Sequence, residues 1–391
     1  MISLLLAIIY ISFISLGLPD SLLGSAWPIM HKDLQVPIAY AGIISMIISG
    51  GTIISSLNSN RLIKKLGTGK VTALSVGMTA IALLGFSFSN SFILLCILAI
   101  PYGLGAGSVD AALNNYVAIN FKAKHMSWLH CFWGLGATTG PYIMGFCLTN
   151  GFTWNTGYLT IGIIQIVLTG ILILSLPLWK INNSKAKKDN EDTTEIESPS
   201  LKEILKIKGA KPILIAFFCY CALESTTGLW GSSYLVMNRG ISAETAAKWI
   251  SLFYLGITFG RFLNGFLAMK LSDKTMIRIG QGIIAIGILS LFLPFKDIGL
   301  CISFILIGLG CAPIYPCIIH STPENFGKNL SQVIIGVQMA SAYMGSTFMP
   351  PLFGLIAEHI TVKLFPFYLI ALVIIMFITV ELLNKVKKAS N

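Results

Sequence analysis

Four ionisable residues lie inside long apolar segments of this 391-residue chain: Asp20, Asp110, Glu224 and Arg261. An ionised side chain at the centre of a membrane costs at least about 2.5–3.5 kcal/mol, so such residues are normally paired or functional. A carboxyl group can bind and release a proton, and a carboxylate accepts hydrogen bonds from the hydroxyl groups of a sugar. The four residues therefore indicate proton handling and recognition of a polar solute.

Asp20 follows Pro19, which removes one backbone hydrogen bond from a helix, and shares a helix face with Gly17 and Gly24. It lies about ten residues before the end of its apolar segment, which is roughly 15 Å along a helix. We predict that Asp20 takes part in proton coupling. The alternative is a carboxylate near a helix end that water simply solvates.

Asp110 follows three glycines, Gly103, Gly105 and Gly107, which we interpret as helix-packing positions. Asn114 comes one turn later, so the carboxyl group and the amide share a helix face. We predict proton coupling through Asp110 and substrate contact at Asn114. The alternative role for Asp110 is a hydrogen-bonded anchor between helices.

Glu224 follows Tyr220 by one turn, and Trp230 and Tyr234 form a second aromatic pair in the same segment. A carboxylate with aromatic rings suits a sugar, whose hydroxyl groups need acceptors and whose apolar faces stack on rings. We therefore predict that Glu224, Tyr220 and Trp230 bind the substrate. Trp230 and Tyr234 also fit an aromatic belt at the membrane surface.

Arg261 lies about 13 Å inside the end of its segment, and we predict an inter-helix ion pair or an inner gate rather than substrate contact. Arg61 and Lys64, in a short basic loop, are assigned to the same gating or structural class. Polar or aromatic residues within apolar segments give three further candidate substrate ligands: His130, Trp133 and Gln338. A lone buried His is, however, more often structural.

The composition is that of a membrane protein, with 55% hydrophobic and 11% charged residues and a mean hydropathy of +0.79. The first apolar run has no basic leader and no cleavage site, which favours a membrane span over a signal peptide. No phosphate-binding loop, catalytic constellation or metal-ligand spacing is present, so we expect no enzyme activity, no metal and no cofactor. The eight cysteines lie in apolar runs and are interpreted as small core residues.

Glycine, proline and charge clusters divide the chain into twelve apolar segments, six on each side of a polar stretch. The segments are 3–30, 38–57, 70–88, 91–119, 127–149, 153–178, 211–237, 244–269, 276–294, 298–320, 330–358 and 363–384. Short basic loops follow the second segment of each half, so we predict a duplicated six-helix unit. The domains would be 1–179 and 211–391, joined by a cytoplasmic linker, 180–210, with a short amphipathic helix from Ser200.

Charge distribution predicts the topology. With both termini placed in the cytoplasm, 21 of the 27 Lys and Arg residues face the cytoplasm, and 5 lie in outer loops. The formal net charge of +11 is thus a topology signal and gives no reason to expect nucleic acid. We expect a multi-pass protein of the plasma (inner) membrane.

Several of these motifs resemble the major facilitator superfamily, and within it the branch of fucose, glucose and hexose proton symporters. That branch has an acidic residue in the first span and another, trailed by Asn, in the fourth, which match Asp20, Asp110 and Asn114. Further matches are the seventh-span residues Glu224, Gly228, Trp230 and Tyr234, the eighth-span 260–262, the tenth-span 308–313 and the following 322–324. The fucose-transporting members have Asn one turn before the first acidic residue, where this chain has Gly17.

The residues and the resemblance together predict an all-α integral membrane protein with twelve transmembrane helices in two pseudo-symmetric six-helix bundles. The expected function is symport of a monosaccharide and protons by alternating access, with the lipid bilayer as its other partner and a monomer as its state. The alternative is a proton-coupled exporter of drugs, lipids or other small molecules. A third class, a membrane enzyme or sensor using Asp110 and His130, lacks any soluble catalytic domain.

Overall fold

The computed structural model describes residues 2–120, 123–186, 201–294 and 298–388, and within these residues the secondary structure is helical with no β-strand. The chain divides into two compact units. The first comprises Met1–Glu195 and Ser242–Ser251, and the second comprises Ile196–Ile241 and Leu252–Asn391. Each unit is described by itself below.

The first unit contains α1 (Ile2–Asp20), α2 (Leu22–Asp33), α3 (Tyr40–Leu66), α4 (Thr68–Phe88), α5 (Phe92–Asn120), α6 (Ala123–Thr149) and α7 (Trp154–Ala186). The predicted first span is therefore helical over its length but is interrupted at Ser21, two residues after Pro19. The fifth predicted span begins earlier than expected, at Ala123. No Gly or Pro follows Pro177 in α7, and the helix continues to Ala186, beyond the expected start of the linker at 180.

The second unit contains α8 (Leu201–Ile204), α9 (Ala210–Arg239), α10 (Ala243–Leu267) from Leu252 onward, α11 (Asp273–Ser290), α12 (Ile298–Cys311), α13 (Ile314–His320), α14 (Thr322–Phe326), α15 (Lys328–Ile356) and α16 (Phe365–Lys388). The start of α10, as far as Ser251, is grouped with the first unit. The π- and 3₁₀-turns η1 (Ala357–Thr361) and η2 (Val362–Leu364) join the last two helices. The predicted tenth span breaks at Pro313 between α12 and α13, whereas α15 runs through Pro350 and Pro351. The short linker helix is present as α8, and Ser200 lies outside the described residues.

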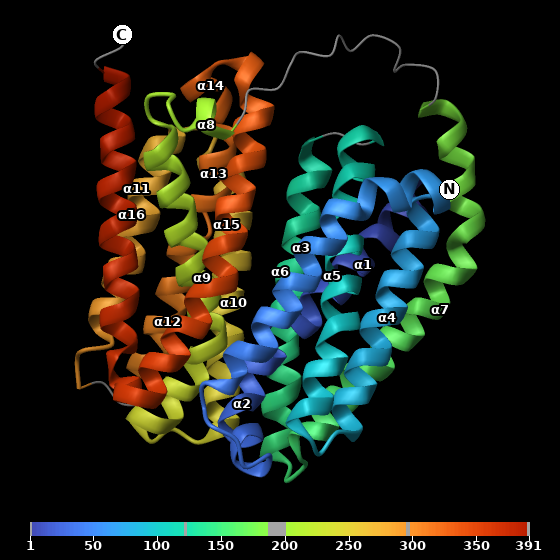
Figure 1. The fold of residues 1–391 in the computed structure, drawn as a ribbon, viewed down its shortest axis with the longest axis vertical. Helices are drawn as coiled ribbons and strands as arrows, with labels where there is room; N and C mark the ends of the chain where they lie inside the picture. Colours follow the sequence, from blue (N-terminus) through green and yellow to red (C-terminus); the bar gives the residue numbers. More distant parts are fainter. Residues whose placement is uncertain (1, 121–122, 187–200, 295–297, 389–391) are drawn as a thin grey trace. The chain divides into compact units, whose positions relative to one another are not determined.

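Equivalent helices pair in the same way in both units (Figure 1). In the first unit the first span, α1, packs on the fifth, α6, while α4 packs on α5 and α7. In the second unit the corresponding α9 packs on α15, while α11 packs on α12 and α16. This repeated pairing is the pattern expected of a duplicated six-helix unit.

Glycines set the close approach of several of these pairs. A methyl group at Gly103 would overlap the carbonyl oxygen of Ile48, and one at Gly107 would overlap that of Thr52, so both glycines let α5 lie directly on α3. Gly105, between them, lies against Ser75 of α4 instead. The interpretation of this glycine series as a packing motif is confirmed. Small residues serve this purpose in membrane helices because apolar burial gives no net attraction within lipid.

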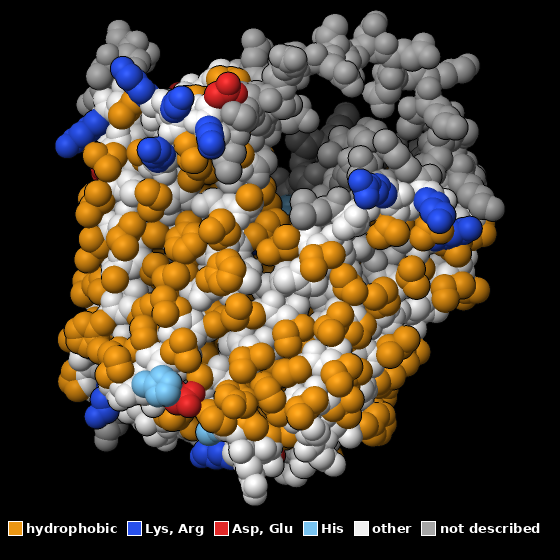
Figure 2. Space-filling view, viewed as in Figure 1, with side chains coloured by type: hydrophobic (Ala, Val, Ile, Leu, Met, Phe, Trp, Pro, Cys, Tyr) orange, Lys and Arg blue, Asp and Glu red, His pale blue; other side chains and the backbone are white. Residues whose placement is uncertain are grey.

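Apolar side chains cover the outside of each unit. Figure 2 shows hydrophobic side chains over the middle of the visible helices in both units, with Lys and Arg gathered near helix ends. Eight described stretches are long and apolar enough to cross a membrane by length and composition, and one of them, Val337–Val386, contains both α15 and α16. A shorter apolar stretch, Tyr40–Ser56, lies in α3. α6 and α11 are not among these stretches, because both carry several charged or polar residues.

Candidate functional site

The carboxyl group of Asp20 accepts a hydrogen bond from the indole of Trp133. The Nε1–Oδ2 distance is 2.8 Å, and the bond joins the end of α1 to the middle of α6. Asp20 is exposed and Trp133 is half-buried. The structure thus brings together two residues that are 113 positions apart and that we had predicted for different roles.

The interruption of the first span next to Asp20 is tied to α6 by a second bond. Pro141 has no N–H group to donate to the carbonyl oxygen of Ala137, four residues earlier in α6. The hydroxyl group of Ser21 donates to that oxygen instead, at 2.9 Å. Ser21 therefore anchors the point where α1 ends, and with it the position of Asp20.

Gly17 permits this close contact between α1 and α6. A methyl group at residue 17 would overlap the carbonyl oxygen of Trp133, and Gly136 and Gly140 lie equally close to the α1 backbone at Ile14 and Leu18. An Asn at position 17 would push the two helices apart. The difference at Gly17 from the fucose-transporting members thus has a structural reason: here the space is filled by the neighbouring helix.

Asp110 lies on α5 and is partly buried. Its Oδ1 accepts a hydrogen bond of 2.8 Å from Nδ2 of Asn114, which also donates to the Asp110 carbonyl oxygen at 3.1 Å. The ion pairs between described residues do not include Asp110. A carboxyl group held by a neutral amide can be protonated without leaving an unpaired cation behind.

Aromatic and histidine side chains surround the α1–α6 contact. The ring of His130 packs edge-on against Phe13, with centroids 5.9 Å apart. One to two turns away, the Tyr10 hydroxyl lies 2.8 Å from Nδ1 of His125, and the Tyr10 ring stacks on Phe132 at 4.7 Å. Substrate contact at His130 remains a prediction; Tyr10 and His125 were not anticipated, because only the folded α1–α6 pair brings them together.

Glu224 of α9 and Arg261 of α10 form the charged centre of the second unit. Arg261 NH2 lies 3.9 Å from Glu224 Oε1, and the side chains are only 15% and 17% exposed. Tyr220 and Tyr315 lie beside the same guanidinium group. The predicted inter-helix pairing of Arg261 is therefore present, as a long ion pair between largely shielded side chains.

Tyr315 is a site residue that sequence reasoning missed. It lies in α13, just past the break at Pro313, and its ring contacts both Tyr220 and Phe217. Its hydroxyl donates to the sulfur of Met339 in α15 at 3.1 Å. The signal available in the sequence was the Pro313–Pro316 bend, which turns this short helix toward α9.

Trp230 and Tyr234 are both buried in the second unit. The Trp230 indole donates to the carbonyl oxygen of Pro350 at 2.8 Å, and Tyr234 stacks on Phe365 at 5.1 Å. In this conformation both rings join α9 to the helices packed on it. Sugar stacking at Trp230 remains a prediction, and it requires a rearrangement that frees the ring.

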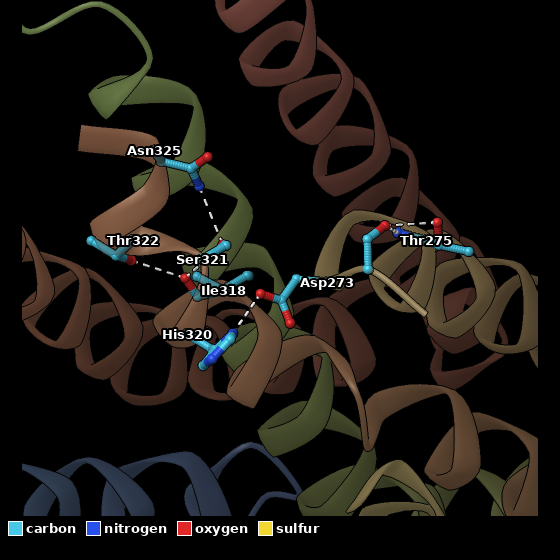
Figure 3. Close-up of polar contacts among 8 residues, drawn as sticks. Asp273, Thr275, Ile318, His320, Ser321, Thr322 and Asn325 are labelled. Atoms are coloured by element: carbon cyan, nitrogen blue, oxygen red, sulfur yellow. Dashed lines mark hydrogen bonds and ion pairs between the residues drawn. The ribbon is translucent and has the colours of Figure 1, made fainter. Parts of the chain in front are cut away.

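Gln338 is also buried, and its Oε1 accepts a hydrogen bond of 3.1 Å from Thr322. Nearby, at the entry to α11, His320 Nδ1 lies 2.7 Å from Oδ2 of Asp273 (Figure 3). Figure 3 shows Thr322 and Asn325 bonding within the same turn, to Ile318 and Ser321. The His320–Asp273 contact connects the start of α11 with the α13–α14 corner, and Gln338 of α15 bonds to that corner through Thr322.

The prediction that Arg61 and Lys64 lie in a loop is wrong, because α3 continues past the apolar segment to Leu66 and includes both residues. Arg61 is exposed near the end of α3, and the side chain of Lys64 lies outside the described residues. Their gating role remains a prediction. Across the described part of the chain, no three His, Cys, Asp or Glu residues are placed to hold a metal ion, and the cysteines are free thiols.

Taken together, the paired helices, the apolar exterior and a few buried ionisable groups in each unit define a polytopic helical membrane transporter. The chain belongs to the Major Facilitator Superfamily, whose model matches residues 9–253 and 213–390. It is a multi-pass membrane transporter of small molecules and not an enzyme.

The chain is similar to several proteins along most of its length. It is 22% identical to the glucose/mannose transporter GlcP of Bacillus subtilis, covering 88% of this chain and 86% of that protein. It is 22% identical to bypass of stop codon protein 6 of Saccharomyces cerevisiae, covering 91% of this chain and 77% of that one. A solved mutant of the nucleoside transporter NupG has the same fold, with a TM-score of 0.77 and 13% identity over 97% of this chain and 98% of NupG.

Proposed function

We propose that this chain is a symporter that carries a monosaccharide, such as a hexose or a deoxyhexose, together with protons across the plasma membrane by alternating access. The observation that supports this most is Asp110 in the first unit, whose carboxyl group accepts a hydrogen bond from the neutral amide of Asn114 and takes part in none of the ion pairs between described residues. Asp20 accepts a hydrogen bond from the indole of Trp133. Neutral donors leave a carboxyl group able to gain and lose a proton during a transport cycle.

The Asp20–Trp133 pair has the chemistry that sugar recognition requires. A sugar presents hydroxyl groups, which bind to carboxylate acceptors, and apolar ring faces, which stack on aromatic side chains. Asp20 and Trp133 offer both within one hydrogen bond of each other, and neither is buried. Asn114 adds an amide on α5, and Tyr220 and Glu224 would serve the substrate in the second unit.

The names of relatives favour the same substrate class. GlcP, which matches most of this chain, is a glucose/mannose transporter, and a hexuronate transporter of Bacillus subtilis is 27% identical over 66% of this chain. At such identities substrates change between relatives, so the choice of a monosaccharide rests on Asp20 and Trp133 as well as on the names.

Transport by purified protein in sealed vesicles tests the proposal. With an acidic exterior, labelled glucose, mannose or fucose should accumulate several-fold above the external concentration, and a weakly buffered medium should become more alkaline. A protonophore should abolish accumulation but leave counterflow of unlabelled against labelled sugar. Accumulation driven by a sodium gradient alone would contradict proton coupling. Efflux of apolar compounds without sugar counterflow would favour the exporter.

We also propose that both termini face the cytoplasm, because Lys and Arg are concentrated in the loops on that side. Fusing reporter proteins to the C-terminus tests the orientation. A fluorescent protein, which matures only inside, should be bright, and a phosphatase that works only outside should be inactive. The opposite pattern would contradict the orientation.

A further inference from the structure

A small, partly open cavity lies in the first unit between α1, α4, α5 and α7. Its volume is about 10 Å³, and its lining includes Ser15, Pro19, Thr79, Val109 and Gln165. This is about the volume that one buried water molecule requires. The cavity also adjoins both carboxyl-bearing segments, since Pro19 directly precedes Asp20 and Val109 directly precedes Asp110.

One wall of the cavity contains a backbone carbonyl oxygen that has no hydrogen-bond donor within its own helix, and Gln165 supplies the missing donor. Pro19 has no N–H group, so the carbonyl oxygen of Ser15, four residues earlier, loses its partner within α1. Nε2 of Gln165 in α7 donates to that oxygen at 2.5 Å. Gln165 is 1% exposed, and burying an amide in apolar surroundings is costly unless it is hydrogen bonded.

The second polar atom of the same amide has no protein partner. Oε1 of Gln165 is buried and, among the described residues, accepts no hydrogen bond. The hydroxyl groups of Ser15 and Thr79 donate to Ser12 and Ser75 within their own helices, so toward the cavity they offer only lone pairs. These three lining oxygens are therefore acceptors, and Tyr102 also lines the cavity with a hydroxyl group that can donate or accept. Such a lining fits an occupant that both donates and accepts hydrogen bonds, as a water molecule does.

We propose that this cavity is a site for one water molecule, and that Gln165 with this water completes the hydrogen bonding that Pro19 interrupts in α1, so that Gln165 is a positioning residue for Asp20. Gln165 fixes the turn of α1 directly before Asp20, and Ser21 fixes the point directly after it. The hydrogen-bonding part stands on the geometry alone. The positioning part rests on the proposed role of Asp20.

A double-mutant cycle between Gln165 and Pro19 tests the hydrogen bonding. Gln165→Leu should lower the melting temperature of the purified protein by about 2–4 °C, because it removes the donor to Ser15. In a Pro19→Ala background the restored N–H group of residue 19 can donate to the carbonyl oxygen of Ser15. Gln165→Leu should then lower the melting temperature by less than half as much as it does with Pro19 present. If Gln165→Leu does not fold, recovery of folding by Pro19→Ala supports the proposal equally.

Gln281 provides a matched control, since it is a 2% exposed glutamine in α11 of the other unit. Gln281→Leu should change the melting temperature by the same amount, whatever its sign, with either residue at position 19, because neither amide atom of Gln281 has a hydrogen-bond partner among the described residues. Equal costs of Gln165→Leu in the two backgrounds would overturn the proposal. A thermal stabilisation by sodium chloride over choline chloride that Gln165→Leu abolishes would also overturn it, because the occupant would then be a cation.

Fluorine NMR of 5-fluorotryptophan-labelled protein tests the positioning. The Trp133 resonance, assigned by Trp133→Phe, reports the hydrogen bond to Asp20. Gln165→Leu should shift this resonance in the same direction as Asp20→Asn, and Pro19→Ala should largely restore it. A Trp133 resonance that Gln165→Leu leaves unchanged, while Asp20→Asn moves it, would refute the positioning role. This readout needs no transport, so failure of the proposed function is seen separately.

Discussion

The two units hold their candidate functional carboxyl groups in different ways. In the first unit Asp110 is bonded to the amide of Asn114, and Asp20 is bonded to the indole of Trp133. In the second unit Glu224 lies near the guanidinium group of Arg261, with Tyr220 and Tyr315 around it. The two units share their helix pairing, so the difference lies in the side chains and not in the fold.

This difference indicates that the carboxyl groups of the two units have different roles in transport. A carboxyl group beside a cation gains most from staying ionised, because protonation would leave the cation unpaired in a dry environment. A carboxyl group with a neutral donor has no such constraint and can change its protonation during each cycle. We therefore infer that the first unit carries the proton, while the second unit keeps a fixed charge pair for the substrate or for gating.

Asp110→Asn gives the largest expected effect and tests this division most directly. The amide cannot ionise, so accumulation driven by a pH gradient should fall at least about tenfold, the change that 1.4 kcal/mol produces. Counterflow, which needs no net proton movement, should continue. Both are measured in proteoliposomes. If proton-driven accumulation survives in Asp110→Asn, Asp110 is not the proton-coupling residue. Asn114→Ala is the control, because it removes the hydrogen bond but leaves a carboxyl group at Asp110 that can still bind a proton.

Arg261→Gln should have the next largest effect. It leaves Glu224 without its cation in a site where both side chains are shielded, and removing one partner of such a pair costs about 1–3 kcal/mol when the contact is as long as 3.9 Å. Thermal unfolding of the purified protein measures this cost. Adding Glu224→Gln should recover part of the lost stability, because the double variant buries no unpaired charge. A double variant that is less stable than either single variant would contradict the pairing.

Asp20→Asn and Trp133→Phe should each raise the KM for sugar about tenfold, since the first removes the negative charge of the acceptor and the second removes the donor, while both keep the shape. The two effects should not add, because both variants weaken the same contact. Asp33 supplies a matched control: its carboxyl group accepts from the indole of Trp154 at 2.9 Å at the end of α2. Asp33→Asn should leave KM unchanged, and a similar rise there would mean that the effect is general to such pairs.

The sequence predicted the helices and the buried ionisable residues because both depend on local composition. Each apolar run that we identified overlaps a helix of the described residues, and charges within those runs stood out against them. The break after Pro19 and the break at Pro313 also follow from local chemistry, since proline lacks a donor.

The partners of these residues could not be predicted in the same way. Trp133 contacts Asp20 only because Gly17, Gly136 and Gly140 let α1 and α6 approach closely. The pattern of residues within one segment does not indicate which other helix that segment packs against. Gln165 is an undistinguished residue in the sequence, and its importance depends on a carbonyl oxygen 150 positions away. Such contacts depend on tertiary packing, which a periodicity or hydropathy argument does not contain.

The smallest expected effect concerns a second carboxylate–guanidinium pair in the unit that holds Glu224. Arg278 and Glu381 form a two-pronged contact, with 2.6 Å between Nε and Oε1, which is much closer than the Glu224–Arg261 pair. Water, however, reaches the pair, since the two side chains are 46% and 25% exposed. Exposed ion pairs contribute little because solvent already stabilises each charge.

Glu381→Gln should therefore change the melting temperature far less than Arg261→Gln, despite the shorter distance that it disrupts. Raising the salt concentration should remove what effect remains, because salt screens exposed charges within about 8–10 Å. The same change in salt should barely alter the cost of Arg261→Gln, since its pair is shielded. If Glu381→Gln were the more damaging variant, distance rather than burial would rank the two pairs, and the fixed charge assigned to Glu224 and Arg261 would lose its physical basis.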